Sequence, residues 1–150
     1  VVTAPTERAP SVLAQRAERK PPNGKTMIAS TVAGNRHGLA VRVLADLFEI
    51  AGWRSICLGA DVPCSDLASA SVYFNADLVA LSISLPTQLK SARQTIEAIR
   101  ARPERDTRII VGGGAFRDVP ELWRELGADG STLQLEEAVA LGERLVALDG

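Results

Sequence analysis

The single histidine of the chain, His37, follows the apolar run 27–32 and precedes a strongly helical stretch. This position predicts a loop between a buried strand and the next helix. In parallel α/β sheets, ligands bind at the carboxyl ends of the strands, so an imidazole there is well placed for chemistry. It could be a metal ligand, a general base or an ordinary loop residue. The choice depends on which other residues reach the same edge.

Two further segments that follow predicted strands have an unusual composition. One carries three hydroxyl groups, at Ser82, Ser84 and Thr87, and the other is the glycine triplet 112–114. Because glycine has no Cβ, we interpret the triplet as a loop against which a bulky, flat group can lie. The carboxyl ends of parallel strands meet at one edge of a sheet, so we expect all three loops to lie together.

Strands and helices alternate along the chain from Lys25 onward. This alternation is typical of βαβ crossovers, and we expect an α/β fold with a doubly wound five-stranded parallel sheet of flavodoxin-like order. The predicted strands are 27–32, 55–58, 78–84, 108–111 and 130–133. Five helices are predicted, of which the first covers residues 39–51, the third residues 89–100 and the fifth residues 138–145. The second is expected to be capped by Ser65. The fourth is expected to open with a capping box of Asp118 and Glu121 and to end at Gly127.

Composition favours one soluble domain with aliphatic layers, since 46% of the 150 residues are apolar and 4% are aromatic. A formal net charge of −1 creates no field that would attract nucleic acid or anionic lipid. No apolar stretch reaches the roughly 20 residues of a membrane helix, and two cysteines form no disulfide framework. We therefore expect a cytoplasmic protein. Residues 1–24 are expected to be a linker or the remnant of a preceding domain, and residues 25–150 the folded domain.

Several chemistries are set aside by the residues themselves. A phospho-receiver domain needs an acidic pair after the first strand, where Gly34 and Asn35 stand. The lysine of a P-loop and the nucleophile elbow of a serine hydrolase are both missing. Cys57 and Cys64 have no further ligands at the spacing of a zinc site.

Taken in order, the loops resemble the cobalamin (vitamin B12)-binding domain family over about residues 25–146. Residues 35–40 resemble the family's Asp-x-His-x-x-Gly, residues 82–84 its Ser-x-Leu, and residues 112–113 its Gly-Gly. Residues 58–63 and 127–130 are also similar to family segments. The similarity is greatest to the regulatory and photoreceptor branch.

The resemblance implies that cobalamin is bound with its dimethylbenzimidazole tail displaced from cobalt and inserted beside the sheet. His37 would replace the tail as lower axial ligand, Ser82 would hydrogen-bond the tail, and Pro63 would contact the corrin. The residues are not expected to distinguish the adenosyl, methyl and hydroxo forms. The implied cofactor-binding residues are Asn35, Arg36, His37, Gly38, Val62, Pro63, Ser82, Ser84, Thr87, Gly112, Gly113, Gly114 and Phe116, with His37 as the metal ligand and no catalytic residue.

One departure from the family pattern guides the functional interpretation: Asn35 replaces the aspartate that accepts a hydrogen bond from the ligating imidazole. It favours a sensory domain of a transcriptional regulator or light-responsive protein, not itself an enzyme. The alternatives are a corrinoid carrier domain of a methyltransferase or mutase, and an interaction module without corrinoid. Expected partners are cobalamin, a DNA-binding domain in the same chain or a regulator protein, and a second copy in a homo-oligomer, with no membrane.

Overall fold

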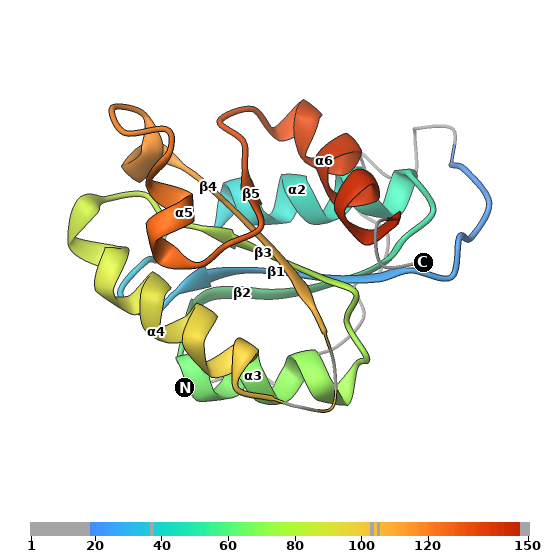
Figure 1. Ribbon diagram of the computed structural model, residues 1–150. Helices are drawn as coiled ribbons and strands as arrows, with labels where there is room; N and C mark the ends of the chain where they lie inside the picture. Colours follow the sequence, from blue (N-terminus) through green and yellow to red (C-terminus); the bar gives the residue numbers. More distant parts are fainter. Residues whose placement is uncertain (1–18, 37, 103, 105, 148–150) are drawn as a thin grey trace.

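Five parallel strands form one sheet in the order β2-β1-β3-β4-β5, with helices on both faces (Figure 1). The predicted fold class and strand order are confirmed. The structure is a computed structural model that describes residues 19–147 except His37, Pro103 and Arg105. The strands are β1 (Thr26–Val32), β2 (Arg54–Val62), β3 (Leu78–Ser82), β4 (Arg108–Gly112) and β5 (Gly130–Ser131). The helices are α2 (Leu39–Ile50), α3 (Cys64–Tyr73), α4 (Leu89–Arg100), α5 (Leu122–Leu126) and α6 (Leu135–Ala147), with 3₁₀ turns η1 (Pro86–Gln88) and η2 (Gly114–Phe116).

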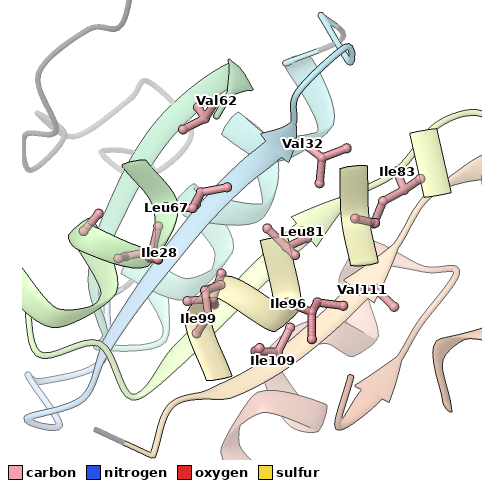
Figure 2. Close-up of a cluster of buried hydrophobic side chains, with 14 of the residues drawn as sticks. Ile28, Val32, Val62, Leu67, Leu81, Ile83, Ile96, Ile99, Ile109 and Val111 are labelled. Atoms are coloured by element: carbon pink, nitrogen blue, oxygen red, sulfur yellow. The ribbon is translucent and has the colours of Figure 1, made fainter. Parts of the chain in front are cut away.

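Each face of the sheet buries its own apolar layer, because successive side chains of a strand point to opposite faces. Ile28 packs with the residues of α3 and α4, and Figure 2 shows it in this cluster with Ile96 and Ile99. Its neighbour Met27 belongs to the other cluster, formed with α2 and α6. Both faces of β1 are therefore covered, which explains the continuous apolar runs in the sequence.

The ends of the three central strands are in register. Thr31 of β1 pairs with Ser82 of β3, and Ser82 pairs with Gly112 of β4. The loops that leave these strands therefore start from the same level of the sheet, as the sequence predicts. This edge is where the candidate site lies.

The structure differs from the prediction at several element ends. β2 continues to Val62 through residues expected to form a loop, with shifts in its register against β1. α3 begins at Cys64 after Pro63, and no side chain caps it, so the predicted Ser65 cap is wrong. The predicted capping box is also wrong, since α5 begins at Leu122 and the Glu121 carboxylate pairs with Arg124 at 3.0 Å instead.

The last residues of the predicted linker pack on the domain. The backbone N–H groups of Lys20 and Asn23 donate to the carbonyls of Ile50 and Gly52 at the end of α2. Residues 1–18 lie outside the described part of the chain, so the domain boundary at residue 24 stays a prediction. Over the described residues, no helix is long and apolar enough to cross a membrane.

Candidate functional site

A cavity of about 250 Å³ opens at the carboxyl edge of the sheet, between the sheet and helices α2 and α6. Its walls are mostly apolar, and Ser82 contributes to them from the end of β3. A cavity of this volume with apolar walls suits a largely apolar group that enters from the edge. The lining residues are Ala40, Val41, Leu44, Ala80, Leu81, Ser82, Ile110, Val111, Gly112, Gly113, Gly114, Arg117, Thr132, Leu133, Gln134, Leu135 and Ala138.

The glycine triplet forms part of this wall and is also tightly packed against neighbouring backbone. A Cβ at Gly112 would lie 2.6 Å from the carbonyl oxygen of Thr132, and one at Gly114 would lie 2.9 Å from that of Ser84. Gly113 has a φ of +112° and faces the carbonyl of Ile83. The interpretation that the glycines make room for a ligand is therefore incomplete, because the close approach of β5 and of the loop after β3 already requires them.

Asn35 ties the loop after β1 to the loop after β3. Its side chain is fully buried, and its Nδ2 donates hydrogen bonds to the carbonyl of Ser82 and to Ser84 Oγ, both at 3.1 Å. The hydroxyl of Thr31 donates to the Asn35 carbonyl. The polar residues predicted after two different strands are thus brought together by direct hydrogen bonds.

Asp61, at the end of β2, holds the same loop from the other side. The Gly34 N–H donates to Asp61 Oδ1 at 2.8 Å, and the Asp61 N–H donates to the Asn35 carbonyl at 2.9 Å. Asp61 has a φ of +58°, a conformation that is uncommon for residues other than glycine. Such a residue is maintained only where the surrounding contacts require it.

The family model described as "B12 binding domain" matches residues 25–141. The chain belongs to this family. A corrinoid protein of Desulfitobacterium hafniense is 28% identical over 122 residues, which are 80% of this chain and 55% of the relative. Dimethylamine corrinoid protein 1 of Methanosarcina acetivorans is 28% identical over 81% of this chain and 56% of the relative. This B12-binding domain thus spans about half the length of the curated relatives it matches.

Solved structures agree with this assignment. A cobalamin-binding protein of Desulfitobacterium hafniense superposes with a TM-score of 0.74 at 26% identity, over 81% of this chain and 58% of that chain. The monomethylamine corrinoid protein of Methanosarcina barkeri has the same fold, with a TM-score of 0.77 at 19% identity. The match covers 89% of this chain and 64% of that chain. The resemblance to the B12-binding family is confirmed, and the domain binds a corrinoid. The expected similarity to the regulatory and photoreceptor branch is not supported by these relatives, which are named corrinoid proteins.

The predicted site residues occupy several different kinds of position. Ser82 and the glycines 112–114 line the cavity. Asn35 and Ser84 form the hydrogen-bonded layer beside it, Arg36 is exposed, and Gly38 caps α2. His37 lies outside the described residues, so its role as metal ligand stays a prediction.

Four further predicted residues also lie outside the cavity lining. Val62 and Phe116 are buried in the core cluster on the α3 and α4 side of the sheet, the face opposite the cavity. Pro63 precedes α3, and Thr87 is exposed on η1. Their contacts with the cofactor stay predictions.

Sequence reasoning missed two groups of residues at this edge. Ala138 of α6 and Ala40 of α2 line the cavity from opposite helices, and their small size was the only signal. Gln88 is buried, and its Oε1 accepts hydrogen bonds from the N–H groups of Ser84 and Leu85 while Nε2 donates to the Gly34 carbonyl. A single glutamine soon after the end of a strand is too common in sequences to indicate this role.

Proposed function

We propose that this domain is a corrinoid carrier that presents cobalamin to a methyltransferase. The observation that carries the proposal is the apolar cavity at the strand ends, with the Ser82 side of β3 and the glycine loop in its wall. Support also comes from relatives that are themselves named corrinoid proteins, one of them for dimethylamine. The proposed carrier role replaces the sensory interpretation as the first candidate.

The chain's own residues would hold the cofactor in two places. The flat base of the nucleotide tail would enter the cavity between α2 and α6, where Ser82 would hydrogen-bond a ring nitrogen. His37 would ligate the cobalt, and imidazole is a suitable ligand for this class of metal. Asn35 and Asp61 fix the loop that carries it. Cobalamin, when bound, supplies a cobalt centre whose reduced form takes up a methyl group as a cation equivalent and gives it to a nucleophile.

The experiment is a titration of the purified chain with hydroxocobalamin, followed by its visible spectrum. Wild type is expected to bind with the spectrum of a corrinoid whose tail is displaced and whose lower ligand is histidine. His37→Ala is expected to lose this spectrum while keeping the fold, as judged by circular dichroism. An unchanged spectrum and affinity in His37→Ala would show that the ligand assignment is wrong.

We further propose that the domain carries the cofactor without catalysing the reaction, so that the catalytic groups lie on the methyltransferase. The loaded full-length protein, with its cobalt reduced, should then gain the spectrum of a methylated corrinoid from a methylated amine only when a methyltransferase is added. Methylation by the loaded protein alone would contradict this division of labour.

Asn35 favours a second candidate, the sensory domain. Its Nδ2 is used as a donor to Ser82 and Ser84, which a carboxylate at this position could not do. An amide also cannot take up a proton while the lower ligand changes. For a sensor, illumination or exchange of the upper ligand should change the association state of the loaded protein in light scattering, whereas a carrier should keep one state.

A further inference from the structure

Arg117 is the only charged side chain among the described residues that line the cavity. We propose that its guanidinium binds the phosphodiester of the nucleotide tail and thereby makes the domain prefer corrinoids that carry this tail. The inference rests on the proposed placement of the tail in the cavity. It adds a specificity determinant that the loop motifs do not contain.

The backbone around Arg117 is fixed by the glycine loop. Arg117 directly follows η2, and its N–H donates to the carbonyl of Gly114 at 3.2 Å. The side chain of Phe116 is fully buried in the core cluster on the α3 and α4 side of the sheet and so fixes the position of the turn. The next side chain, that of Arg117, is exposed at the rim, so the turn places a long cationic side chain beside the cavity.

Three arginines near this part of the sheet are paired with carboxylates. Arg100 and Arg108 lie within 2.8 and 3.6 Å of the Asp129 carboxylate. Arg124 pairs with Glu121. In the part of the chain that the structure describes, Arg117 forms no such ion pair, although Asp118 is its neighbour in sequence. Its charge is therefore available for a ligand.

The chemistry of the two partners is complementary. The nucleotide tail of cobalamin carries one negative charge, on its phosphodiester, while the rest of the cavity lining is apolar or neutral. Guanidinium groups bind phosphate oxygens with paired hydrogen bonds and are less strongly hydrated than ammonium groups. A single cation at the rim matches a ligand whose flat base lies inside and whose charge remains at the entrance.

The test compares two ligands on the same variants. Cobalamin carries the nucleotide tail, and cobinamide has the same corrin without the tail. In Arg117→Gln, the Kd for cobalamin is expected to rise about threefold at low salt, the size typical of one exposed charge pair. The Kd for cobinamide is expected to stay unchanged, and the salt dependence of cobalamin binding should decrease. Arg117→Lys should recover part of the loss.

Two matched variants serve as controls. Arg93→Gln removes an exposed cation of α4, which does not line the cavity, and Arg124→Gln removes one on α5. If Arg93→Gln weakens cobalamin binding as much as Arg117→Gln does, or if Arg117→Gln weakens both ligands equally, the inference is wrong and the carrier proposal stands. If wild type binds neither ligand, the proposed function itself fails.

Discussion

The Nδ2 atom of Asn35 lies 3.1 Å from the Oγ of Ser84, and this hydrogen bond joins two loops that are 49 residues apart in the sequence. The same nitrogen also donates to the carbonyl of Ser82. Both interactions need a donor at position 35, where the family pattern has a carboxylate. The domain has thus adapted this edge of the sheet around an amide.

Asn35→Asp is expected to destabilise the domain despite its similarity to the family pattern. The buried carboxylate would face the Ser82 carbonyl, an acceptor, and lose two donated hydrogen bonds. A cost of about 1–3 kcal/mol in the free energy of unfolding is expected for such a group. Urea unfolding of the apo domain measures it. Asn75→Asp, at an exposed position, is the control, and equal stability of the two variants would contradict the account.

Asp61 should matter through both its side chain and its backbone conformation. Asp61→Ala removes the acceptor for the Gly34 N–H and leaves a residue with a Cβ at positive φ, and should weaken cobalamin binding as well as stability. Asp61→Asn keeps an acceptor and tolerates this φ, so it should behave nearly as wild type. Asp61→Gly tolerates the positive φ but, like Asp61→Ala, lacks the acceptor for the Gly34 N–H. In isothermal titration with cobalamin, wild type should bind most tightly, Asp61→Asn nearly as tightly, and Asp61→Gly and Asp61→Ala more weakly.

Gly113→Ala is expected to be far more harmful than Gly34→Ala. Both glycines have positive φ, but a Cβ at Gly113 would overlap the backbone of Ile83, whereas a Cβ at Gly34 meets nothing within 4 Å. Gly34→Ala should therefore cost only the conformational term of about 1 kcal/mol. Gly113→Ala should cost about 3 kcal/mol or more, because backbone has to move. Thermal unfolding of both variants provides the comparison.

Filling the cavity should block cobalamin without disturbing the fold elsewhere. Ala138 of α6 lines the cavity, and Ala140 of the same helix is exposed and does not. Ala138→Leu is expected to reduce the affinity for cobalamin at least tenfold, while Ala140→Leu leaves it unchanged. Near-wild-type melting temperatures would show that both variants are folded. Undiminished binding by folded Ala138→Leu would remove the cavity from the site.

The sequence predicts the sheet and its order well because each central strand is covered on both faces and therefore forms a continuous apolar run. It also predicts that Ser82 and the glycines meet, since that follows from parallel strands alone. The roles of Asp61 and Gln88 could not be predicted, because they depend on which backbone groups approach across the edge. Phe116 illustrates the opposite problem. It belongs to a loop rich in site residues, yet its ring is buried on the opposite face of the sheet.

Ala40 at the start of α2 and Ala138 in α6 stand on the two sides of one cavity, although nearly the whole domain separates them along the chain. A ligand between them binds only when both helices are docked, so its binding energy stabilises the complete fold and no partial one. With the cofactor in this cavity, the corrinoid should not be captured during synthesis until α6 has left the ribosome. Cofactor binding in this cavity should therefore depend on a docked α6, and the apo and loaded domains should differ most in the resistance of α6 to local unfolding.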